Sequence, residues 1–143
     1  MADARPAAAA FLDAIPRMMC DLRNELADSG SGLTIAQFRC LKMVQRSADV
    51  SLGDLADAHG VSPPAMSKLV DGLFEAGLLE RRPDGNDRRR LQLSVTAAGK
   101  RKLEAVGDRL KTALAARLSP LAPAELAALE RALTTLNAPL VTA

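Results

Sequence analysis

The fold is decided by the stretch SLGDLADAHGVSPPAMSKLVDGLFEAGLLERRPDGNDRRRLQLSVTAAG, residues 51–99. A capping pattern at Ser51 and Asp54 predicts a short helix, which Gly60 ends because glycine takes the left-handed conformation without strain. A longer helix is predicted to follow, since apolar residues recur at steps of three and four. Its expected buried face consists of Met66, Leu69, Val70, Leu73, Phe74 and Leu78.

A β-hairpin is predicted next, because the spacing of the apolar residues changes to alternation. Leu91, Leu93 and Val95 alternate with polar residues, which is typical of a strand with one buried face, and residues 78–82 supply its partner. Turn-forming residues at 83–87 join the two strands. We therefore expect a solvent-facing tip rich in arginine, with Arg81, Arg82, Arg88, Arg89 and Arg90 in this region.

Helices are also predicted before this stretch. Residues 11–26 carry an apolar stripe at helical spacing, and the breaker run 28–32 ends it. Pro16 predicts either a kink or a helix start at that point, because proline lacks a backbone donor. Thr34 and Gln37 form a capping-box pattern that opens a second helix.

Two further helices are predicted after the hairpin. Thr96 caps a long helix that Pro120 ends, and the last helix begins near Pro123. The last helix is expected to bury Leu126, Leu129, Leu133 and Leu136. The apolar stripes of the first helix and of these two exceed what one chain of 143 residues buries in a single small core, so dimerisation is expected.

Composition favours a mainly α-helical protein. Hydrophobic residues make up 48% of the chain but aromatic residues only 2%, so the core must be built from Leu, Val, Met and Ala. The formal net charge is +2 and resides in residues 80–90, where five arginines face three acidic residues. The first 19 residues lack a long uncharged apolar run, which disfavours a signal peptide or membrane span and predicts a cytoplasmic protein.

Residues suited to catalysis or metal binding are sparse. The chain has one histidine, His59, and two cysteines, Cys20 and Cys40, without metal-ligand spacing. We therefore expect no enzymatic activity, no metal and no cofactor. Both cysteines are interpreted as buried structural thiols, and His59 as a residue that interacts with the dipole at a helix end.

A helix, a glycine turn, an amphipathic helix and a basic hairpin together favour docking onto DNA. The exposed start of the second helix fits the major groove, about 12 Å wide, while the hairpin reaches a neighbouring minor groove. Arginine suits that groove, and Asp87 is spaced to orient Arg89 through a charge-assisted hydrogen bond. An alternative is a winged-helix module that binds protein without DNA, although a cationic tip disfavours it.

Residues 51–99 resemble the central region of the MarR family of regulators, and the similarity is colinear from about Leu33 to Gly99. The resemblance implies a winged helix-turn-helix fold, mainly α with a small β-hairpin wing, with N- and C-terminal dimerisation helices. It divides one compact chain, interlocked in a dimer, into an N-terminal helix at 1–32, a DNA-binding region at 33–99 and C-terminal helices at 100–143.

The resemblance also implies DNA contacts. The segment from Ser62 to Lys68 would touch bases, and Arg89, with Asp87 as its partner, would enter the minor groove. Pro63 and Pro64 remove two backbone N–H groups, so we expect this helix to begin one residue late and to hold phosphate less well. The expected DNA-binding residues are Ser62, Pro64, Ala65, Ser67, Lys68, Arg82, Asp87, Arg88, Arg89 and Arg90, with thymine methyl contacts from Pro64 or Ala65.

A homodimer on a pseudo-palindromic operator is implied as well, acting as a repressor that a small aromatic or phenolic acid releases. Arg17, Arg23, Arg39 and Lys42 border the expected cleft, where one of them would pair with a ligand carboxylate unless all are merely solvated. The alternative is a thiol-based oxidant sensor that uses Cys20. This alternative is weaker, because Cys20 lies far along the first helix and the chain has no tyrosine.

Overall fold

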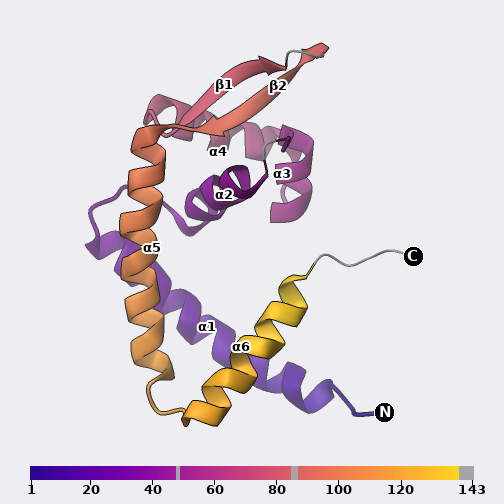
Figure 1. Cartoon of the computed structure of the whole chain (residues 1–143), viewed down its shortest axis with the longest axis vertical. Helices are drawn as coiled ribbons and strands as arrows, with labels where there is room; N and C mark the ends of the chain where they lie inside the picture. The colour runs from indigo at the N-terminus through magenta and orange to yellow at the C-terminus, as the bar shows by residue number, and fades with distance from the viewer. Residues whose placement is uncertain (48, 85–86, 139–143) are drawn as a thin grey trace.

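The computed structural model describes residues 1–47, 49–84 and 87–138, and the side chains of these residues apart from 83–91. The helices and strands in these ranges are α1 (Arg5–Asp28), α2 (Ile35–Arg46), α3 (Leu52–His59), α4 (Pro63–Glu75), β1 (Leu79–Asp84), β2 (Asp87–Val95), α5 (Ala97–Leu118) and α6 (Pro123–Asn137). Figure 1 shows α2, α3, α4 and the hairpin gathered at one end. The long α5 leads from there to the end where α6 lies, and α1 packs along α5 (Figure 1).

The first helix is longer than its apolar stripe predicts. It begins at Arg5, with Pro6 in the first turn, where the missing N–H has no intrahelical partner. The helix continues through Pro16, so a start at that residue, one of the two expected outcomes, is wrong. The Leu12 carbonyl has no donor at position 16, because Pro16 lacks a backbone N–H, and Leu12 itself is 73% exposed.

The capping predictions for α2 and α3 are confirmed. Thr34 Oγ1 accepts from the Gln37 backbone N–H and the Gln37 side chain accepts from Thr34 N–H, both at 3.1 Å. Ser51 and Asp54 make the same reciprocal pair at 3.1 Å. Gly60 ends α3 with φ 64° and ψ 33°, the left-handed conformation expected of it.

The expected late start of α4 is wrong. The helix begins at Pro63, and the Ser62 hydroxyl caps it by accepting from Ala65 N–H at 3.3 Å. Both prolines fall in the first turn, where backbone donors have no carbonyl to reach inside the helix, so neither delays it.

The hairpin is confirmed and is longer than predicted. β1 and β2 pair antiparallel with Leu79 opposite Val95 and Arg81 opposite Leu93, and the register shifts between Pro83 and Asp84. β2 begins at Asp87, so the backbone of residues 88–90 belongs to a strand rather than to the turn.

The core lies where α2, α3 and α4 meet beneath the hairpin, and α5 extends it. Its largest fully buried side chains are Leu41, Leu55, Met66, Leu73, Val70 and Cys40. In contrast, α6 has no buried residue among those described, so the expected burial of its stripe is wrong for a single chain. Exposed large apolar side chains include Leu126, Leu133 and Leu136 on α6 and Phe11, Leu12 and Ile15 on α1.

The two cysteines differ. Cys40 is fully buried, and burial raises the pKa of its thiol to about 11, as suits a structural thiol. Cys20 is exposed, so its interpretation as a buried thiol is wrong. The reason is helical geometry: α1 packs on the core through Leu22 and Leu26, and Cys20 lies about 200° around the helix from Leu22.

No helix in the described part of the chain is long and apolar enough to cross a membrane. The division at residues 32 and 99 stays a prediction.

Candidate nucleic-acid interface

The start of α4 presents a small polar surface to solvent. Ser62, Pro64, Ala65 and Lys68 are exposed and Ser67 is half-buried, whereas the opposite side of the helix is fully buried. The amphipathic spacing therefore brings together the N-cap Ser62 and the four residues of α4 that were predicted to contact DNA. A lysine and two hydroxyls beside apolar carbon form a surface able to read base edges and methyl groups.

The short helix α3 supports α4 from behind. It packs against α4 and buries Leu55 and Ala56 in the core. His59 Nδ1 donates to the Leu55 carbonyl at 2.8 Å, which satisfies an oxygen of the last turn as a helix-end role predicts. Its Nε2 is buried and has no hydrogen-bond partner among the described residues. His59 thus serves the fold of α3.

Arg81 attaches the wing to α4. Its Nη2 donates to Asp71 Oδ1 at 2.9 Å, and its guanidinium carbon lies 4.3 Å from the centroid of the Phe74 ring. Both partners lie on α4, so one side chain of β1 contacts this helix at two positions. Sequence reasoning counted Arg81 only as one of five arginines, because nothing local pairs it with a residue ten positions earlier.

The other strand of the wing is held from the opposite side. Gln92 on β2 donates to Asp49 Oδ1 at 3.1 Å, which ties the wing to the segment before α3. At the base of the hairpin, Thr96 Oγ1 donates to the Gly77 carbonyl at 2.7 Å. The wing is therefore fastened at both edges and at its base.

Gly99 allows α5 to approach the hairpin closely. A Cβ at this position would overlap the Leu78 carbonyl and lie 2.7 Å from Val95 Cγ1. Glycine is required here because the obstructing atoms include backbone, which cannot move aside as a flexible side chain does.

The predicted wing contacts are described only in part. Arg82 is exposed and lies 3.4 Å from Glu80 Oε2, a surface pair too weak to withhold it from a partner. The predicted roles of Asp87, Arg88, Arg89 and Arg90 rest on side chains outside the described residues. Of these four, the structure gives the backbone alone, as part of β2.

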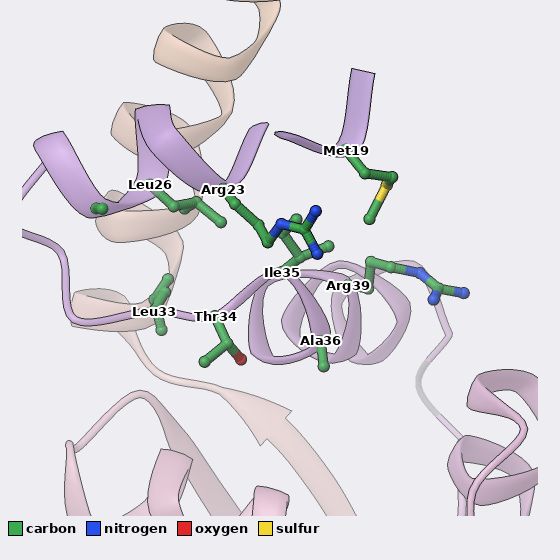
Figure 2. A pocket seen from close by; sticks show the side chains of 9 residues that line it. Met19, Arg23, Leu26, Leu33, Thr34, Ile35, Ala36 and Arg39 are labelled. Atoms are coloured by element: carbon green, nitrogen blue, oxygen red, sulfur yellow. The ribbon is translucent and has the colours of Figure 1, made fainter. Parts of the chain in front are cut away.

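A hollow of about 540 Å³ lies between α1 and α2, and Arg23 and Arg39 border it. Figure 2 shows Arg23 reaching from α1 across Ile35, with Arg39 on α2 near Met19. The rest of the lining is mostly apolar and consists of Met19, Leu26, Ala27, Leu33, Thr34, Ile35 and Ala36. Of the four predicted ligand residues, the hollow joins two, because Arg17 lies apart from it and Lys42 lines a different hollow.

Comparison with known proteins places these features in a family. The MarR family model matches residues 31–90. The transcriptional repressor Rv2887 of Mycobacterium tuberculosis is 33% identical over 103 residues, which make up 68% of this chain and 74% of the repressor.

Solved structures are similar over nearly the whole chain. Rv1404 of M. tuberculosis superposes with a TM-score of 0.77 at 30% identity, covering 95% of this chain and 92% of its own. Rv2887 in complex with p-aminosalicylic acid gives 0.75 at 24%, covering 90% and 96%. A mutant of E. coli MarR in complex with operator DNA gives 0.72 at 22%, covering 92% and 94%, and at this identity the likeness concerns the fold. By its sequence relatives and its winged helix-turn-helix architecture, this chain belongs to the MarR family.

Proposed function

We propose that this protein is a transcriptional repressor that binds a pseudo-palindromic operator in duplex DNA as a homodimer. The observation that carries the proposal is the attachment of the wing to α4 through Arg81, which holds two DNA-facing elements side by side. The names of Rv2887, a repressor, and of the E. coli MarR complex with operator DNA support it. Its action is regulatory rather than catalytic and takes place in the cytoplasm.

In this proposal, α4 reads the major groove and the wing enters the minor groove. Ser67 and Lys68 contact base edges, since both lie on the accessible side of α4. Arg89, oriented by Asp87, enters the minor groove, where the negative potential attracts a guanidinium. Arg82, Arg88 and Arg90 add charge that holds phosphate.

A second copy of the chain covers the apolar residues that α1 and α6 expose. Leu126, Leu133 and Leu136 are between 38% and 68% exposed in one chain, and Phe11 and Ile15 are nearly half exposed. A two-fold dimer places two reading helices about one turn of DNA apart, which matches a pseudo-palindrome.

The test is salt-dependent binding to DNA from the promoter of the protein's own transcription unit. Arg89→Ala is expected to weaken binding and to lower the log–log salt slope by about 1 if it also touches phosphate. Lys68→Ala is expected to relax base preference, at a cost of about 1–3 kcal/mol if it reads a guanine. Arg5→Ala, at the far end of α1, is the matched control. Unchanged affinity in both test variants would contradict the docking proposal.

The effector that we propose is a small aromatic acid in the hollow between α1 and α2. A volume of about 540 Å³ suits a compact ligand, and two arginines are well suited to a planar carboxylate. The complex of Rv2887 with p-aminosalicylic acid supports this ligand class. The helix α1 belongs to the proposed dimer region, and α2 belongs to the proposed DNA-binding region. A ligand bound between these two helices would therefore change the distance between the two regions.

Thermal unfolding with salicylate tests the effector. Saturating ligand is expected to raise the melting temperature, since ligand at 100 times its Kd adds about 2.7 kcal/mol of stability. Arg23→Gln and Arg39→Gln are each expected to weaken binding about tenfold, whereas Arg17→Gln, on α1 outside the hollow, is the control. The absence of a shift with a broad panel of aromatic acids would exclude this effector class.

The exposure of Cys20 favours oxidant sensing as a second candidate. Its Sγ receives a hydrogen bond from Asn24 Nδ2 at 3.7 Å, and the other cysteine is buried. Peroxide should abolish operator binding by the wild type and spare Cys20→Ser if this candidate is right; equal responses of the two proteins would dismiss it.

A further inference from the structure

A lysine of α5 holds the connection between α1 and α2. Lys102 Nζ donates to the Ser31 carbonyl at 2.7 Å, across 71 positions of sequence, and both residues are half-buried. The donor is charged, which makes this hydrogen bond stronger than one between neutral groups. In the described part of the chain Lys102 forms no ion pair, so the Ser31 carbonyl is the partner that fixes its ammonium group.

The connection that Lys102 holds has a defined shape of its own. Ser29 Oγ accepts from the Ser31 N–H and Ser31 Oγ accepts from the Leu33 N–H, both at 3.2 Å. Gly30 and Gly32 take the left-handed conformation, with φ 68° and 73°. Because local hydrogen bonds and turns shape this connection, a bond that fixes Ser31 also fixes the start of α2.

The two ends of this bond belong to different parts of the molecule. Lys102 lies in the part of α5 that packs against the proposed DNA-binding region, where Leu103 is buried and a Cβ on Gly99 would overlap the Leu78 carbonyl. Ser31 follows α1, whose exposed apolar face belongs to the proposed dimer region. Figure 1 shows the connection between α1 and α2 beside α5, so the bond joins the two regions where the chain passes from one to the other.

Two ion pairs hold α1 to α5 further along the same helix. Arg109 pairs with Glu25, and Arg117 pairs with Asp21. Lys102, Arg109 and Arg117 follow one another at steps of seven and eight residues, so they lie about two helical turns apart along one side of α5. Removal of the bond from Lys102 therefore leaves α1 attached to α5 by the ion pairs and releases the connection alone.

The orientation of α1 relative to α2 matters for a dimer on DNA. A homodimer presents two copies of α4, so a change in the angle between α1 and α2 is applied once in each chain. The half-sites of a pseudo-palindrome lie a fixed distance apart, which demands a fixed distance between the two copies of α4. We propose that Lys102 is a positioning residue for operator binding, and that its bond to Ser31 sets this distance. The proposal rests on the proposed function, namely a homodimer on a pseudo-palindromic operator.

The distance between the two DNA-binding regions tests the proposal without DNA. Pulsed electron paramagnetic resonance measures it in the dimer with a nitroxide on Asp57→Cys, at an exposed position of α3, in a Cys20→Ser background that leaves only the buried Cys40. Lys102→Met keeps the apolar stem but removes the donor, and is expected to broaden the distribution of distances. Lys102→Arg still donates and is expected to keep the distribution narrow. Circular dichroism verifies that each variant folds.

Operator binding supplies the second measurement. Fluorescence anisotropy compares DNA from the promoter of the protein's own transcription unit with the same DNA carrying one extra base pair between its half-sites. The extra base pair moves one half-site by about 3.4 Å, so the wild type is expected to bind this DNA about tenfold more weakly. Lys102→Met is expected to bind the native operator about fivefold more weakly and to lose most of the discrimination, because a mobile connection accommodates both spacings. Arg101→Met, at the exposed neighbour of Lys102, is the matched control and removes the same charge.

Two outcomes would overturn the proposal. One is a distribution of distances in Lys102→Met as narrow as that of the wild type. The other is a loss of discrimination that Arg101→Met reproduces, which would assign the effect to charge. A wild-type chain that gives no distance between two labels, or that binds no operator, would instead refute the proposed function, and with it this role of Lys102.

Discussion

The helices α4 and α6 differ in how much of their apolar face one chain covers. Both have leucines at steps of three and four, yet Met66, Val70 and Leu73 are fully buried, whereas Leu136 is 68% exposed. The apolar face of α4 is therefore covered within one chain, whereas the apolar face of α6 is exposed to solvent. Helical periodicity reveals that a face must be covered, but it does not say which chain covers it.

The largest expected effect separates these two helices directly. Leu73→Ala should destabilise the protein by about 2–5 kcal/mol, because it leaves a cavity in a fully packed core. Leu136→Ala should change the stability of dilute protein by about 0.5 kcal/mol or less, as is usual for exposed positions. Urea unfolding at several protein concentrations measures both. Equal losses in dilute protein would mean that α6 is already packed in the monomer.

A charge on α6 should instead break the association of two chains. Leu133→Glu is expected to cost about 3 kcal/mol of dimerisation, or about a hundredfold in Kd, since the interface would bury an unpaired carboxylate. Sedimentation equilibrium measures the Kd. The helical content of the reading region should persist, and a dimer of unchanged Kd would place the interface away from α6.

A substitution of Arg81 tests whether its contacts with α4 hold the wing in place within one chain. Arg81→Met removes an exposed ion pair and a cation–π contact, which together contribute about 1 kcal/mol, so DNA affinity should fall about fivefold. The log–log salt slope should stay unchanged, because Arg81 holds α4 rather than phosphate. Arg82→Met, one residue along, is the comparison and should lower the slope by about 1. A similar drop in slope for Arg81 would make it a DNA contact.

The features predictable from the sequence were those fixed locally. Local sequence determines the capping boxes at Thr34 and Ser51 and the left-handed conformation of Gly60. Each depends on neighbours within four residues, so the sequence pattern alone predicts it. The contact of Arg81 with α4 and the exposure of Cys20 depend on how separate elements pack, which periodicity does not encode. Lys42 lines a different hollow from Arg23 and Arg39, and this too depends on how the helices pack.

The smallest expected effect concerns α1, which resembles α6 in its exposed apolar face but is tied to α5 by ions. Arg117 donates to both carboxylate oxygens of Asp21, at 2.7 and 2.9 Å, and Arg109 donates to Glu25 at 2.8 Å. The hydrogen bonds from Arg117 hold the pKa of Asp21 below its ordinary value of 3.8.

The pKa of Asp21 is lower in the folded chain than in the unfolded chain, so the unfolded chain binds more protons at a pH between the two values. The ion pair therefore stabilises the fold fully above the unfolded pKa, and this stabilisation is lost as the pH falls through the folded pKa. Asp21→Asn should therefore lower the free energy of unfolding at neutral pH, and its difference from the wild type should shrink as the pH falls through the folded pKa. Urea unfolding from pH 7 to about pH 3 measures this difference, with Asp28→Asn on the same helix as control. A difference that stays constant with pH would mean that the ion pair between Asp21 and Arg117 does not help to hold α1 against α5.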